Sequence, residues 1–143
     1  MKRLNPYIGF KGKTREALGY YQSIFGGEAT FMTVGETPQE VQSMCPPGTA
    51  DQVMHGQLDL GAFALMGTDM GDPNAHPAHS DCSRISVAID CSDKAEIEKL
   101  YRSLGEGGSI GCPLGPAFWG GDFGMVTDKY GVNWLLTLMP QKP

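Results

Sequence analysis

Two stretches of the chain repeat one pattern of apolar and polar positions at a constant offset of 79 residues. Apolar residues at intervals of three and four predict an amphipathic helix in each stretch, opened by a capping residue and closed by glycine. The matching pairs are Leu18 with Ile97, Tyr21 with Leu100, Phe25 with Leu104, and Gly26 with Gly105. Two such copies must bury their apolar faces together, so we predict a duplicated architecture with any binding site in the concavity that the copies form.

The first half predicts a strand, a helix and three further strands. Thr14 is expected to cap the first helix, and Gly26-Gly27 to end it. A capping box with proline at the first helical position, Thr37-Pro38-Gln39-Glu40, predicts a second, short helix. The expected elements are a strand at 6–10, a helix from 14, a strand at 29–34, a helix up to about Met44, and a hairpin of strands 53–59 and 62–66 about Leu60-Gly61.

The second half repeats this order. Alternating apolar residues predict a half-buried strand at 84–90, and Asp93 with Glu96 opens a helix that Gly105 ends. A strand at 109–111 follows, which Pro113 limits to an edge or an end. Strands 123–127 and 133–139 form a hairpin around residues 128–131, in which Gly131 suits a positive φ. Each half is therefore predicted as βαβββ, joined by an irregular loop at about 70–81.

Length and charge narrow the class of protein. With 143 residues and 15.4 kDa, the chain is expected to form one compact domain. A net charge of −5 and a pI near 5.0 argue against nucleic acid or an anionic membrane as partners. The first residues have no apolar signal-peptide core, and no run approaches the roughly 20 apolar residues of a transmembrane helix. We therefore expect a cytoplasmic location.

The four cysteines are widely spaced and form no CxxC pair, so reduced thiols are expected. Cys91 is expected to pack as a small apolar residue at a strand end. His76, His79 and Cys82 could hold a structural zinc ion, which normally takes four ligands. A solvated loop that happens to hold two histidines is the preferred interpretation of that segment.

Three runs of the sequence resemble the PhnB-like proteins of the vicinal oxygen chelate superfamily, which includes glyoxalase I, bleomycin-resistance proteins and extradiol dioxygenases. The runs are Pro6-Tyr7-Ile8-Gly9-Phe10, Glu16 to Gly27, and Phe118-Trp119-Gly120 with Phe123 to Trp134. The resemblance implies an α+β fold of two βαβββ modules in a half-open barrel, assembled as a homodimer. It places module one at about 5–69, a linker at about 70–81 and module two at about 82–139, all within one domain, 1–143.

Some PhnB-like proteins are described as demethylubiquinone methyltransferases. This sequence has no Gly-rich loop that follows a strand and opens a helix to hold a nucleotide-like cofactor. The segment Gly105-Glu106-Gly107-Gly108 ends a helix instead. The expected function is therefore binding of a small organic molecule, with unassigned chemistry.

Catalytic members of the superfamily hold a divalent metal with His and Glu from the first and fourth strands of each module. Carried onto this chain, these positions fall near Pro6 or Tyr7, at about Met66, near Arg84 and near Leu135. None of these side chains is a good ligand for such an ion, so we expect neither a metal nor another cofactor. The alternative is a metal-dependent lyase or dioxygenase of the glyoxalase type, with His55 and Glu36 or Asp69 rebuilding the site.

The strand at 53–59 places His55, Gln57 and Asp59 on one face, which suits the binding cup better than the core. His55 is the candidate for a general base or a ligand contact. The alternative is that a neighbouring backbone group forms a hydrogen bond with His55. We prefer this alternative, because a single histidine without a partner at a fixed spacing is weak evidence for a catalytic site. Arg84 pairs either with an acidic ligand group or with an Asp on the sheet, and the second is preferred.

Aromatic residues near the C-terminus suggest a wall for a flat ligand or ordinary packing. Trp134 and Phe123 are expected to take part in ordinary core and turn packing of the last hairpin, whereas Trp119 beside Gly120-Gly121 fits either interpretation. Asp128 is expected to form a turn rather than to act as an acid. The predicted ligand-binding residues are His55, Gln57, Arg84, Trp119 and Tyr7.

Overall fold

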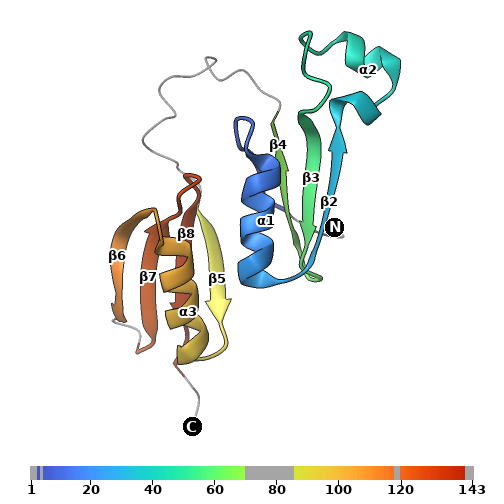
Figure 1. Ribbon diagram of the computed structural model, residues 1–143. Coiled ribbons are helices and arrows are strands. Elements are labelled where there is room, and N and C mark those ends of the chain that lie inside the picture. The colour runs from blue at the N-terminus through green and yellow to red at the C-terminus, as the bar shows by residue number, and fades with distance from the viewer. Residues whose placement is uncertain (1–2, 4, 70–85, 118–119, 141–143) are drawn as a thin grey trace. The chain divides into compact units, whose positions relative to one another are not determined.

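The computed structural model describes residues 3, 5–69, 86–117 and 120–140 (Figure 1). The chain divides into two compact units, one within residues 1–77 and the other within 78–143. Within the described parts, no helix is long and apolar enough to cross a bilayer. The expected linker at about 70–81 lies outside the described residues.

The first unit contains one four-stranded sheet with the strand order β1-β4-β3-β2. The β1–β4 pair is parallel, and the β3–β4 and β2–β3 pairs are antiparallel. Its elements are β1 (Tyr7–Gly9), α1 (Thr14–Phe25), β2 (Glu28–Thr33), the 3-10 turn η1 (Val34–Glu36), α2 (Gln39–Ser43), β3 (Val53–Asp59) and β4 (Ala64–Thr68).

The second unit repeats this topology, with the strand order β5-β8-β7-β6. Its elements are β5 (Val87–Cys91), α3 (Lys94–Gly105), β6 (Ser109–Pro116), β7 (Asp122–Thr127) and β8 (Asn133–Leu138). Both units are therefore βαβββ modules, which confirms the predicted α+β class and the internal repeat. The half-open barrel and the single domain concern how the modules combine and stay predictions.

Helix α1 packs on one face of the first sheet. Its residues Ala17, Leu18 and Tyr21 are fully buried. A Cβ atom on Gly56 would lie 2.9 Å from both Leu18 and Thr14, so glycine is needed where the helix approaches β3. Side chains alternate along a strand, so the neighbours of Gly56, including His55 and Gln57, point to the opposite face.

The second unit is built in the same way around α3. Ile97 and Leu104 are fully buried, and Val126 and Leu136 are buried on the sheet. Trp134 is only 1% exposed, and its indole Nε1 donates to Asp128 Oδ2 at 2.7 Å. The expectation that Trp134 belongs to the core is confirmed.

Asp128 is a turn residue, as predicted. Its Oδ1 accepts the backbone N–H groups of Tyr130 at 2.8 Å and Val132 at 3.1 Å. Gly131 adopts a φ of 87°, the positive value that the sequence indicated. The buried carboxylate thereby fixes the β7–β8 turn and the tryptophan beneath it.

The start of α1 differs from the prediction. Thr14 is the first helical residue rather than the cap, and the cap position, Lys13, makes no side-chain capping bond. Asp69, at the end of β4, serves instead: its Oδ1 accepts the Thr14 N–H and its Oδ2 the Val53 N–H, both at 2.9 Å. A carboxylate suits a helix N-terminus because the free N–H groups there carry positive partial charge.

The Asp69 carboxyl has a lowered pKa. Partial burial acts to raise the pKa, but the hydrogen bonds from Thr14 and Val53, with Arg15 nearby, outweigh it. The buried Thr14 hydroxyl lies close enough to contribute, although its geometry falls short of a regular hydrogen bond. Asp69 therefore joins the helix start to the start of β3 through its ionised form.

Two further element boundaries differ from those predicted from the sequence. The capping box lies four residues earlier than predicted, because Glu36 Oε2 accepts the Thr33 N–H at 3.2 Å, whereas α2 has no side-chain cap. The strand β6 continues past Pro113 to Pro116. It can do so because β6 is an edge strand, where a residue without an N–H is tolerated, and its register shifts around Cys112.

We predict that Asp69→Asn lowers the free energy of unfolding by about 1–3 kcal/mol at pH 7, because one backbone donor then faces an amide N–H₂. The wild-type advantage is present above the unfolded pKa of about 3.9 and is lost as the pH falls through the lower folded value. Urea unfolding from pH 3 to pH 7 measures it.

Asp51→Asn is the matched control, since Asp51 is an exposed acid of the same unit. It should change the unfolding free energy by less than about 0.5 kcal/mol at every pH. An Asp69→Asn effect that persists unchanged at pH 3 would contradict the assigned role of the carboxylate.

Candidate functional site

The face of the first sheet opposite α1 carries the candidate site, and we call it the distal face. The register places Tyr7 beside Met66, Met66 beside Gln57, and Gln57 beside Thr30. Two residues further along the β2–β3 pair, Met32 lies beside His55. At the end of the sheet that carries the candidate site, the distal face holds six residues: Tyr7, Thr30, Met32, His55, Gln57 and Met66.

Tyr7 and His55 form a stacked pair on this face. Their ring centroids are 5.8 Å apart and the ring planes differ by 22°. The two residues come from β1 and β3, with β4 between them, so their side chains lean across the intervening strand. Tyr7 is still 56% exposed, which leaves much of its ring available for a further contact.

The side-chain polar atoms of Tyr7, His55 and Gln57 make no hydrogen bond to any described residue. Within the described residues, neither ring nitrogen of His55 takes part in a hydrogen bond, and the same holds for the Tyr7 hydroxyl and the Gln57 amide. The interpretation that a neighbouring backbone group satisfies His55 therefore finds no support in this part of the chain. Each of these groups can both donate and accept.

Two methionines flank the stack, and sequence reasoning did not select them as ligand contacts. Met32 is 41% exposed beside His55, and Met66 is half-buried beside Tyr7. The signal that could have found Met32 is the alternation along β2, in which Glu28, Thr30 and Met32 share the face of His55.

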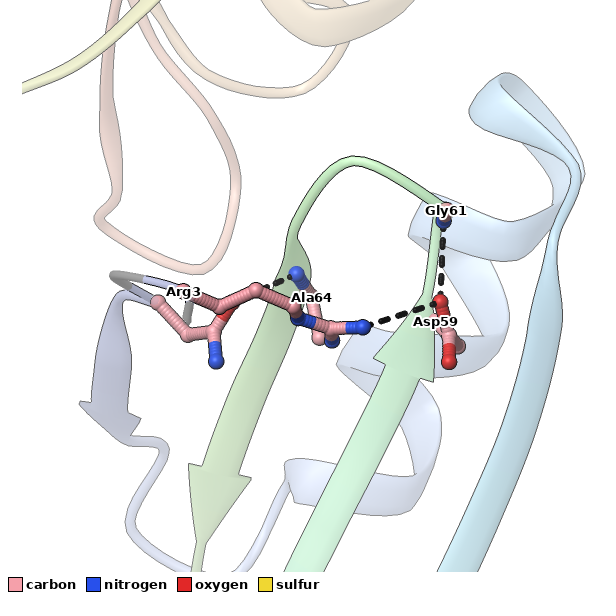
Figure 2. A network of polar contacts seen from close by, with 5 residues as sticks. Arg3, Asp59, Gly61 and Ala64 are labelled. Atoms are coloured by element: carbon pink, nitrogen blue, oxygen red, sulfur yellow. Dashed lines mark hydrogen bonds and ion pairs between the residues drawn. The ribbon is translucent and has the colours of Figure 1, made fainter. Parts of the chain in front are cut away.

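Asp59, the third residue of the predicted polar face, is already engaged. Its Oδ1 lies 3.7 Å from an Arg3 guanidinium nitrogen and accepts the Gly61 N–H at 2.8 Å (Figure 2). Asn5 Oδ1 accepts the Ala64 N–H nearby, which holds the segment before β1 against β4. The polar side chains at this end of the face therefore stabilise the fold and are not available to a ligand.

At the positions where catalytic superfamily members hold a metal, the described residues of this chain are poor metal ligands. Tyr7 and Met66 are direct neighbours across β1 and β4, and Leu135 lies beside Met125 on the second sheet. A phenol, a thioether and an alkyl group do not suit a hard or borderline dication. Among the described residues, no three His, Cys, Asp or Glu side chains gather into a metal-binding group.

Asp69 and Glu36, the carboxylates proposed for a metal-dependent lyase or dioxygenase, already accept hydrogen bonds from the backbone. Asp69 accepts two backbone N–H groups, and Glu36 accepts the Thr33 N–H. A metal held by His55 with either one would compete with these bonds.

Several predicted residues lie outside the described part of the chain. They are Arg84, Trp119, His76, His79 and Cys82. Phe123 is half-buried on β7. It alternates with Gly124, whose Cβ would meet Tyr101 of α3, so Phe123 points away from α3. Tyr130 lies in the β7–β8 turn beside Lys129.

The described cysteines, Cys45, Cys91 and Cys112, are free thiols. Burial, together with the nearby acids Glu96, Asp90 and Asp93, raises the pKa of the Cys91 thiol to about 11. A thiol in this state is a weak nucleophile, and Cys91 packs as a small apolar residue, as predicted.

A family model described as 3-demethylubiquinone-9 3-methyltransferase matches residues 2–137. The chain belongs to this family. The Escherichia coli K12 protein YjdN is 29% identical to it, over 98% of this chain and 97% of that protein.

Two solved structures are similar over nearly the whole chain. Protein PA1353 from Pseudomonas aeruginosa is 36% identical with a TM-score of 0.81, covering 97% of this chain and 98% of that one. A PhnB protein from Bacillus cereus is 28% identical with a TM-score of 0.70, covering 94% and 98%. The resemblance to PhnB-like proteins is therefore confirmed.

The fold extends to more distant proteins. A glyoxalase/bleomycin resistance protein/dioxygenase family enzyme from Burkholderia phytofirmans PsJN is 14% identical with a TM-score of 0.59, covering 97% of this chain and 98% of that one. At this identity the likeness shows the fold alone. It confirms the predicted glyoxalase/bleomycin-resistance/dioxygenase fold.

We predict that Tyr7→Leu and His55→Gln each change the free energy of unfolding by less than about 1 kcal/mol. The reason is that both side chains lie on the distal face and add little to the α1 core. Urea unfolding checks this, with the fully buried Leu58→Ala as the contrasting variant, expected to lose about 2–5 kcal/mol. A loss from Tyr7→Leu as large as that from Leu58→Ala would show that the pair is structural.

Proposed function

We propose that this PhnB-like protein binds a small organic molecule on the distal face of its first sheet, without the metal site of the catalytic superfamily members. The observation that carries the proposal is the Tyr7–His55 stack, with centroids 5.8 Å apart and polar atoms that find no hydrogen-bond partner among the described residues. Ligand sites in proteins combine mainly apolar and aromatic contacts with a few such polar groups.

The chemistry at this site is left unassigned by the proposal. His55 is the candidate general base, because imidazole is the side chain that most often moves protons in enzymes. Gln57 lies two residues further along β3 on the same face and can orient a bound molecule by hydrogen bonding. Arg84 and Trp119 remain proposed ligand contacts from the sequence.

The methyltransferase reaction in the family description is a weaker candidate. A nucleotide-like cofactor is commonly held by a Gly-rich loop at a helix N-terminus. Here carboxylates already occupy both long-helix starts: Asp69 accepts the Thr14 N–H, and Asp93 accepts the Glu96 N–H. These acids disfavour an anionic group at either position.

The proposal also includes a homodimer in the cytoplasm, without nucleic acid or membrane as partners. The dimer is implied by the family resemblance, and the location is the expectation drawn from the sequence. A net charge of −5 supports the absence of polyanionic partners, because such partners attract basic surfaces.

A fragment screen by ligand-observed NMR tests the proposal. A chemically diverse panel should contain binders whose affinity falls about tenfold or more in Tyr7→Ala/His55→Ala, since ring contact and hydrogen bonding are both removed. Met44→Ala is the matched control, because Met44 is 79% exposed and lies outside the sheet. Binders that hold equally well to the double variant would place the site elsewhere.

Metal analysis separates the metal-dependent lyase or dioxygenase alternative. We predict that protein purified without chelator contains well under one equivalent of zinc, nickel or iron per chain, because the described residues offer no group of three suitable ligands. Elemental mass spectrometry measures the content. One equivalent of metal that disappears in His55→Ala would establish the alternative.

A further inference from the structure

We infer that the ligand is an uncharged planar ring system carrying hydroxyl or carbonyl groups, which stacks on the Tyr7–His55 pair. The inference rests on the proposed function and names the chemical class of its ligand. Three properties of the distal face support it: the exposed aromatic surface, the sulfur atoms beside it, and the balance of hydrogen-bonding and charged groups.

The aromatic surface favours a flat partner. Tyr7 and His55 are inclined by only 22°, so the pair presents a nearly parallel stack. Offset stacking with centroids about 4.5–7 Å apart is the preferred arrangement of aromatic rings, and a further planar ring can extend it in the same geometry. A puckered aliphatic ring cannot bring all its atoms into contact with such a surface.

The apolar side chains beside the stack are both thioethers. Met66 adjoins Tyr7 in the sheet register and Met32 adjoins His55, so each member of the pair has a methionine as a register neighbour. Methionine sulfur makes favourable contacts with aromatic rings, and its flexible chain adapts to ligand edges. None of the six side chains at this end of the face is leucine, isoleucine or phenylalanine, so its apolar surface is formed by thioethers and aromatic rings.

The polar groups favour an uncharged ligand with hydroxyl or carbonyl substituents. The Tyr7 hydroxyl, the His55 imidazole and the Gln57 amide can each complement such a group. The charged residues of this face lie at its other end, where Glu28 and Asp59 are register neighbours and Asp59 pairs with Arg3. Among the described residues, no arginine or lysine lies beside the stack to hold a carboxylate or phosphate, and Arg84 is expected from the sequence to pair with an Asp on the sheet.

The test uses the intact chain and three probes of one size: 2-naphthol, its saturated counterpart decahydro-2-naphthol, and 2-naphthoate. Isothermal titration calorimetry gives each Kd. We expect 2-naphthol to bind about three- to tenfold more tightly than decahydro-2-naphthol, which is the range that an aromatic contact contributes. Tyr7→Leu should remove this preference, whereas Met44→Ala should keep it, and 2-naphthoate should bind more weakly than 2-naphthol.

The outcomes separate this inference from the proposed function. Equal binding of the planar and saturated alcohols, both weakened by Tyr7→Leu, would overturn the planar class and leave binding at the distal face standing. Tighter binding of 2-naphthoate would overturn the uncharged class alone. Binding of 2-naphthol that Tyr7→Leu does not change would overturn both proposals, and no binding of any probe would overturn the planar class.

Discussion

The close packing of α1 on the first sheet determines the rest of that unit. Glycine at position 56 lets the helix approach β3, where a Cβ atom would lie 2.9 Å from Leu18 and Thr14. Gly67 makes room on β4 for the ring of Phe10, which lies between β1 and α1, since a Cβ there would be 2.6 Å from that ring. Because side chains alternate, fixing these two positions against the core sends His55, Gln57 and Met66 to the other face. A register shift of one residue would exchange the core and the site.

The two modules share a topology but treat their polar side chains differently. On the second sheet, Thr127 Oγ1 donates to Asn133 Oδ1 at 2.6 Å and Thr137 Oγ1 donates to Asp90 Oδ1 at 2.8 Å, so these groups satisfy each other. On the first sheet, His55 and Gln57 have no such partners within the described residues. Unpaired polar groups beside an aromatic stack are typical of a surface that meets a ligand, whereas paired ones are typical of a surface that supports structure.

The sequence predicted most of the fold because its signals are local. The 3,4 spacing of apolar residues located α1 and α3, and alternation placed His55 and Gln57 on one face. The cap of α1 could not be predicted, since Asp69 lies 55 residues from Thr14 in the chain. The contact between Tyr7 and His55 could not be predicted either, because it is also long-range: it depends on β4 pairing with both β1 and β3.

The different caps of the two long helices have a consequence for the order of folding. Helix α3 receives its cap from Asp93, immediately before its first turn, and Glu96 returns a bond to the Ser92 N–H at 2.6 Å. This helix can form as soon as its own residues are available. Helix α1 takes its capping carboxylate from Asp69, which follows Thr14 by 55 residues and lies at the end of β4. We therefore expect the N-terminal helix to depend on long-range contacts for its formation, whereas the C-terminal helix can begin to form from local ones.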